Sequence, residues 1–217
     1  MNSIPRFAAP GAGRTSALLV AALVAMLLAA PISAAPVADA APAALGICVA
    51  CHGAHGEGAS TGVPRLAGQN ADYLSHALAM FKAGTRTSAI MQPIAGTLDD
   101  AEMRSLADYF SHQSAAPVDA ATPASPELAP AGKLLAEKGA GNVPACFSCH
   151  AAQGQGNGAR FPSIAGQPAQ FLVDRLHEFQ ARARAKTPDA GSMTAVAALL
   201  DELQIEESAA YLSKLGR

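Results

Sequence analysis

Cysteine and histidine recur in this chain at a spacing that can attach a porphyrin covalently. The pattern Cys-x-x-Cys-His occurs at residues 48–52 and 146–150, and it uses all four cysteines of the chain. Two intervening residues let one helical turn present both sulfurs to a haem edge, and the histidine that follows can bind the iron. The sequence therefore predicts two covalently attached haem c groups. Their predicted thioether sites are Cys48, Cys51, Cys146 and Cys149, and their predicted axial histidines are His52 and His150.

Three other chemistries also use paired cysteines. A thioredoxin-like redox pair lies beside a βαβ pattern, which this sequence does not contain. A zinc site usually has its second pair within about 15–20 residues, whereas 94 residues separate Cys51 from Cys146. Disulfides are compatible with an exported protein, but they do not explain why a histidine follows each pair.

A second axial ligand is needed if the iron is to carry electrons rather than bind a substrate, and methionine or histidine usually supplies it. The two halves of the chain align at a constant offset of 98 residues from Cys48 to Gln69. Equivalent sites should carry the same ligand, so the alignment can be used as a filter. Beyond residue 34, Met91 is matched by another methionine, Met193, whereas Met80 and Met103 fall opposite other residue types. Met91 and Met193 are therefore the predicted sixth ligands.

Histidine does not pass the same filter. Each remaining histidine falls opposite a different residue type, so we expect these side chains at the surface or partly packed: His55, His76, His112 and His177. Ligation by one histidine and one methionine fills both axial positions and raises the reduction potential relative to two histidines. It predicts electron transfer without substrate chemistry at the iron.

Helical periodicity runs through both halves, and no segment alternates with period two for long enough to predict a strand. The expected helices cover residues 71–83, 169–186 and 126–138, and two more begin at the capping pairs Asp99–Glu102 and Asp201–Gln204. A four-residue increase in the offset places one insertion between Gly84 and Met193, in the loop ahead of Met193. The sequence predicts an all-α fold. Glycines shared by the two halves are expected in loops against the macrocycle: Gly56, Gly58, Gly154 and Gly156.

The change of composition along the chain predicts the domain organisation. Residues 1–34 combine two arginines, an uncharged apolar run and small residues, which indicates a signal peptide cleaved between residues 34 and 40. An uncleaved membrane anchor is the alternative, although the 14-residue apolar run is shorter than the ~20 residues that span a bilayer. We expect a first domain at 35–113, a linker rich in proline and alanine at 114–126 and a second domain at 127–217. The formal charge of −2 gives no indication of a nucleic-acid partner.

Taken together, the two haem motifs, the two downstream methionines, the Pro-x-x-Ala-Gly-Gln stretches and the linker resemble the dihaem cytochrome c4 family. The resemblance covers residues 45–215 and implies two class I cytochrome c-like domains in tandem. It implies the same thioether sites and the same iron ligands as those named above. It also implies that the carbonyls of Pro64 and Pro162 accept a hydrogen bond from the axial histidines. One departure is that no amphipathic helix is expected before the first motif, because of Pro42.

The resemblance further implies a periplasmic carrier of the respiratory chain, soluble or peripherally associated with the membrane. It would pass electrons between protein partners such as a quinol–cytochrome c reductase and a terminal oxidase. The alternative is a dihaem electron-transfer subunit of a dehydrogenase complex that oxidises sulfide, alcohol or thiosulfate. A dihaem enzyme acting alone is disfavoured by the chain length and by the paired methionines.

Overall fold

The computed structural model describes residues 41–114, 126–186, 189 and 191–216. These residues belong to one compact unit, residues 41–217. Their regular secondary structure is helical, and their β contacts are isolated bridges, which confirms the all-α class. The expected signal peptide and residues 115–125 of the expected linker lie outside the described residues. No described helix is both long and apolar enough to cross a membrane.

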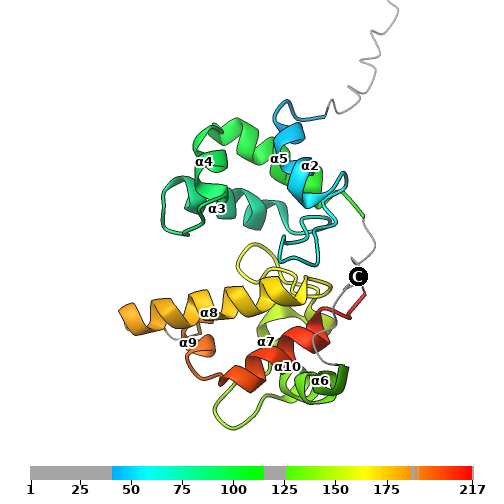
Figure 1. Cartoon of the computed structure of the whole chain (residues 1–217), viewed down its shortest axis with the longest axis vertical. Helices are drawn as coiled ribbons and strands as arrows, with labels where there is room; N and C mark the ends of the chain where they lie inside the picture. The colour runs from blue at the N-terminus through cyan, green and yellow to red at the C-terminus, as the bar shows by residue number, and fades with distance from the viewer. Residues whose placement is uncertain (1–40, 115–125, 187–188, 190, 217) are drawn as a thin grey trace, which may run out of the picture. The chain divides into compact units, whose positions relative to one another are not determined.

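The helices form two groups that follow the internal repeat (Figure 1). In the first group, α3 packs against α4 and α5; in the second, α10 packs against α6 and α8, and α8 packs against α9. The first group contains α2 (Leu45–His52), α3 (Ala71–Lys82), α4 (Met91–Gly96) and α5 (Asp100–Ser111). The second contains η1 (Pro126–Leu128), α6 (Ala129–Lys138), α7 (Phe147–His150), η2 (Ala152–Gly154), α8 (Ala169–Ala185), α9 (Met193–Ala197) and α10 (Glu202–Leu212).

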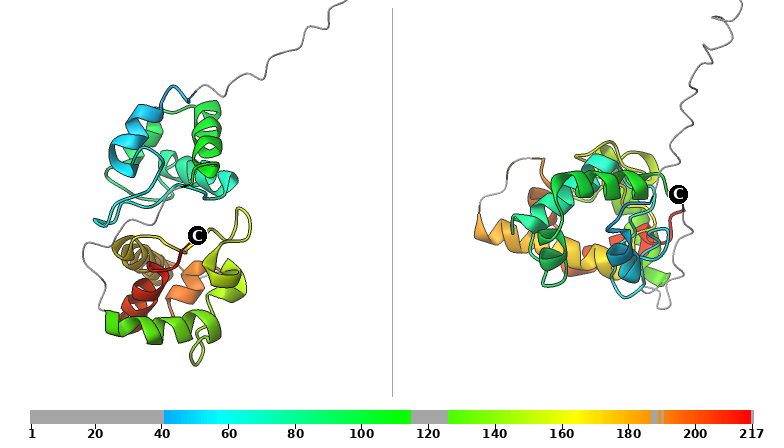
Figure 2. Two further views of the ribbon diagram at one scale, coloured as in Figure 1. Left: turned by 90° about the vertical axis from the view of Figure 1, so that its right-hand side faces the viewer. Right: turned by 90° about the horizontal axis from the view of Figure 1, so that it is seen from above.

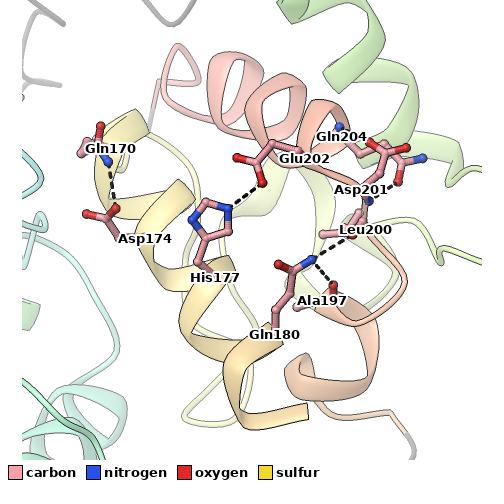
Figure 3. Close-up of polar contacts among 9 residues, drawn as sticks. All are labelled: Gln170, Asp174, His177, Gln180, Ala197, Leu200, Asp201, Glu202 and Gln204. Atoms are coloured by element: carbon pink, nitrogen blue, oxygen red, sulfur yellow. Dashed lines mark hydrogen bonds and ion pairs between the residues drawn. The ribbon is translucent and has the colours of Figure 1, made fainter. Parts of the chain in front are cut away.

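Both expected capping pairs are present at the start of the last helix of each group. The Asp99 carboxylate accepts from the Glu102 N–H at 2.8 Å, and the Glu102 side chain accepts from the Asp99 N–H at 2.9 Å. Asp201 and Gln204 repeat this arrangement at 2.8 and 3.1 Å (Figure 3). Each box satisfies backbone donors that a helix N-terminus otherwise leaves unpaired.

Asp99→Ala is expected to lower the free energy of unfolding by about 1 kcal/mol, because it removes the side-chain acceptor at the N-terminus of α5. Urea unfolding of the haem-loaded protein measures this loss. Asp108→Ala, at the other end of the same helix, is the matched control and should stay within about 0.5 kcal/mol of the wild type. Equal losses in the two variants would contradict a capping role for Asp99.

The two cores are built from equivalent positions. In the first group Leu74 of α3 packs with Ala107 and Phe110 of α5, and all three are buried. The counterparts in the second group are Leu172, Ala209 and Leu212, which form one buried cluster with Ala136 of α6. The spacing of these residues follows helical periodicity, since residues three and four apart lie on one side of a helix.

Helix α6 precedes the second haem motif and lies against α10 (Figure 2). Gly132 of α6 is buried at this contact, and a Cβ atom there would lie 1.8 Å from the carbonyl oxygen of Glu207. The two helix backbones therefore approach closely because position 132 has no side chain. Before the first motif, the described residues begin at position 41, and α2 begins at Leu45. The positions equivalent to α6 are residues 31–40, which lie outside the described residues, so the expectation drawn from Pro42 stays a prediction.

The insertion in the second half is partly helical, contrary to the expectation that it lies in the loop ahead of Met193. The position equivalent to Lys82, the last residue of α3, is Gln180, yet α8 continues to Ala185. A run of helix-favouring alanine and arginine residues, 181–185, explains the difference, because it extends the helix rather than interrupting it.

Candidate haem sites

Each motif histidine is the last residue of a helix, and its side chain is buried. His52 ends α2 with 7% of its surface exposed, and His150 ends α7 with 4% exposed. The Nδ1 atom of His52 donates to the Pro64 carbonyl at 2.9 Å, and Nδ1 of His150 donates to the Pro162 carbonyl at 2.7 Å. A carbonyl can only accept, so Nδ1 carries the proton and Nε2 has the lone pair that a metal requires.

Burial also favours the neutral, metal-binding form of both rings. It lowers the pKa of His52 and of His150, and the hydrogen bond to the proline carbonyl partly opposes this effect. The two sites therefore hold a neutral imidazole of fixed tautomer and fixed orientation, which is how proteins usually present histidine to a metal.

The four cysteines form no disulfide and are arranged in the same way in both motifs. Cys48 and Cys146 are half-buried, whereas Cys51 and Cys149 are exposed. Burial raises the pKa of the Cys48 and Cys146 thiols. Within the described ranges, no three or more His, Cys, Asp and Glu side chains are grouped closely enough to hold a metal ion. The two cysteine pairs therefore do not converge on one another as a zinc site would require.

A glycine loop joins each histidine to its proline. The N–H of Gly58 donates to the His52 carbonyl at 2.8 Å, and Gly156 repeats the contact with His150 at 2.8 Å. Gly58 has a φ of +83°, and a Cβ atom there would lie 2.7 Å from the Val63 carbonyl oxygen. The backbone of the loop itself therefore requires glycine at this position, a constraint additional to the expected approach of the macrocycle.

The two predicted methionine ligands occupy equivalent places. Met91 is the first residue of α4 and Met193 is the first residue of α9, and both side chains are half-buried. The Met91 N–H donates to Ser88 Oγ at 3.0 Å, and Ser192 caps α9 by accepting from the Ala195 N–H at 3.2 Å. Each methionine therefore lies at a helix start whose backbone is fixed by a serine side chain.

One polar side chain from each long helix binds the backbone at the end of the following methionine helix or just beyond it, and no sequence motif indicated either contact. Gln180 of α8 donates to the carbonyls of Ala197 and Leu200 at 3.1 and 2.9 Å (Figure 3). Its counterpart Lys82 donates to the Leu98 carbonyl. Lysine and glutamine share only a donor group at the end of a long side chain, so the pair gave no motif to detect.

The remaining histidines lie at or near the surface. Three of them are exposed, and they are His55, His76 and His112. His177 is partly buried on α8, where Nε2 contacts the Glu202 carboxylate at 2.9 Å (Figure 3). These positions agree with the prediction that the four histidines lie at the surface or are partly packed.

The cytochrome c family model matches residues 42–114 and 130–216. Cytochrome c4 of Azotobacter vinelandii is 35% identical over 181 residues, covering 78% of this chain and 84% of that protein. The chain belongs to the dihaem cytochrome c4 family. The reduced cytochrome c4 of Pseudomonas stutzeri has 34% identity and a TM-score of 0.70, over 81% of this chain and 98% of the other. A relative from Stutzerimonas stutzeri (strain A1501), named as a thiosulfate dehydrogenase electron acceptor, is 38% identical over 179 residues, covering 81% of this chain and 82% of that protein.

Membership of this family gives the chemistry of the two sites. The chain carries two covalently attached haem c groups at its Cys-x-x-Cys-His motifs, and it acts as an electron carrier rather than an enzyme. Haem iron accepts and releases one electron at a time. The residues of this chain supply the thiols, the orientation of the histidines and the buried surroundings.

Proposed function

We propose that each haem iron is ligated by one histidine and one methionine, in the pairs His52 with Met91 and His150 with Met193. The observation that supports this most strongly is the repetition of the whole site. In both halves a buried histidine has its Nδ1 atom bound to a proline carbonyl, and a half-buried methionine begins a short helix. Filling both axial positions leaves no site for oxygen or peroxide, so the protein transfers electrons only.

We also propose that the carrier works in the periplasm, with residues 1–34 as its signal peptide and with domains at 35–113 and 127–217. Periplasmic attachment of haem c and the charge and hydropathy pattern of residues 1–34 support this placement. The protein would take electrons from a quinol–cytochrome c reductase and deliver them toward a terminal oxidase. The resemblance to cytochromes c4 supports this direction of transfer.

A second candidate function is to accept electrons from a thiosulfate dehydrogenase. The relative named as a thiosulfate dehydrogenase electron acceptor is 38% identical to this chain, and cytochrome c4 from A. vinelandii is 35% identical. Overall identity therefore does not separate the two roles, and both require the same pair of haem sites. They differ in which protein reduces the cytochrome.

Stopped-flow measurements with the haem-loaded protein distinguish these functions. The reduced protein is mixed with membranes containing the terminal oxidase, and the oxidised protein is mixed with thiosulfate and a thiosulfate dehydrogenase. Oxidation by the membranes at the rate of respiration, with slow reduction in the second mixture, supports the respiratory role. Fast reduction only in the second mixture overturns it and supports the role of a thiosulfate dehydrogenase acceptor.

A further inference from the structure

Two buried glutamine side chains bind the backbone of the other half of the repeat. The amide of Gln167 accepts from the Arg65 N–H at 3.0 Å and donates to the Arg65 carbonyl at 3.0 Å. The amide of Gln69 makes the same pair of bonds with Ser163, at 2.8 and 2.9 Å. A backbone N–H can only donate and a carbonyl can only accept, so the orientation of both amides is fixed.

These contacts are buried and symmetric with respect to the repeat. Gln69 and Gln167 are 4% and 5% exposed, and they are equivalent residues at the offset of 98. Their backbone partners Arg65 and Ser163 are also equivalent and also buried. One buried glutamine of each half therefore binds the backbone of the other half.

The peptide group that each glutamine binds is the one that holds the axial histidine. The Pro64 carbonyl and the Arg65 N–H belong to a single peptide unit. Its oxygen accepts from Nδ1 of His52 at 2.9 Å, and its N–H donates to Gln167. A continuous chain of hydrogen bonds thus runs from the His52 ring to the Gln167 amide. The peptide unit of Pro162 and Ser163 connects His150 to Gln69 in the same way.

Hydrogen bonds in such a chain strengthen one another. When an amide N–H donates, electron density moves onto the carbonyl oxygen of the same peptide, and that oxygen becomes a better acceptor, by about 10–30% per bond. A stronger acceptor draws the Nδ1 proton further from the ring, which makes the imidazole a stronger electron donor and stabilises ferric iron.

We propose that each glutamine is a positioning residue that lowers the reduction potential of the haem in the opposite half. Gln167 acts on the haem of His52, and Gln69 acts on the haem of His150. This inference rests on the proposed ligation of iron by the two histidines. It assigns to the contact between the halves an electronic role in addition to its contribution to stability.

The test uses Gln167→Met and Gln69→Met in the haem-loaded protein, because methionine keeps much of the buried volume and removes both hydrogen bonds. Gln167→Met should shift the equilibrium of the first haem toward ferrous iron about two- to threefold, or by about 18–28 mV at 59 mV per tenfold change. Gln69→Met should shift the second haem instead. A redox titration followed by proton NMR reports each haem through its own resolved signals.

A second measurement examines the histidine directly. In the reduced, diamagnetic protein, the Nδ1 proton of His52 should move upfield in Gln167→Met, because its hydrogen bond weakens, while that of His150 stays in place. Gln167→Glu keeps an oxygen acceptor for the Arg65 N–H and should not move the His52 signal upfield. Gln170→Met is the control, since Gln170 is exposed and bonds Asp174 within α8 (Figure 3).

The pattern across variants decides the outcome. Shifts confined to the opposite haem, with the His52 signal maintained by Gln167→Glu, support the proposal. Equal shifts of both haems, shifts of the haem in the mutated half, or no shift would overturn it. If Gln167→Met does not retain haem, the comparison of Gln167→Glu with Gln69→Met supplies the same test. Failure of histidine ligation itself would be visible in the wild-type spectra, before any glutamine is changed.

Discussion

Met91→Ala is expected to remove the far-red absorption of the oxidised protein at one of its two haems and to convert that iron to a high-spin form. Loss of the thioether removes the ligand that favours ferrous iron. The potential of that haem should fall on the order of 0.2 V, part of the ~0.8 V range over which axial ligands act. Optical spectroscopy of the purified protein and a spectroelectrochemical titration measure both effects.

Met80→Ala provides a control of the same chemical kind. Met80 is a half-buried residue of α3 whose position in the repeat is occupied by Glu178. The Met80→Ala variant should keep both far-red bands and both reduction potentials. Met193→Ala should reproduce the loss at the other haem. Retention of the full far-red band in Met91→Ala would show that the first iron has a different ligand.

Gly132→Ala is expected to destabilise the second half by about 1–3 kcal/mol or more, because no space exists for a methyl group at the contact between α6 and α10. The added Cβ would meet the Glu207 carbonyl oxygen at 1.8 Å and its carbonyl carbon at 2.5 Å. Both atoms are backbone, so a side-chain rotation cannot relieve the overlap. Urea unfolding followed at the haem absorption band measures the loss.

Gly46→Ala is the matched control for this change. Gly46 lies in α2, it is exposed, and a Cβ atom there has no neighbour within 4 Å. Alanine favours helix over glycine by about 1 kcal/mol, so this variant should be neutral or more stable than the wild type. An unfolding midpoint of Gly132→Ala at or above that of Gly46→Ala would contradict the close approach of the two helices.

The close contact at Gly132 belongs to the second half, where α6 packs against the last helix with Leu135 and Ala136 buried. At the offset of 98 residues, the corresponding positions of the first half are residues 31–40, which lie outside the described residues.

Local interactions made much of this protein predictable from its sequence. The capping boxes at Asp99 and Asp201 join residues three apart, and the buried faces of α3, α5 and α10 follow helical periodicity. The Cys-x-x-Cys-His motifs likewise fit within single helical turns. Comparison of the two halves also identified Met91 and Met193 as candidate iron ligands, because a residue with the same function should be the same in both halves, whereas other positions can differ. Their role as ligands stays a prediction.

The tertiary structure alone decided the contacts that join distant residues. Gln69 and Gln167 stood out as repeated residues, but their partners lie 94 and 102 residues away, and no local pattern indicates such a pairing. The same holds for Gly132, whose need for glycine comes from the carbonyl of another helix. Sequence periodicity specifies which face of a helix is buried, whereas the packing of the whole chain determines what that face meets.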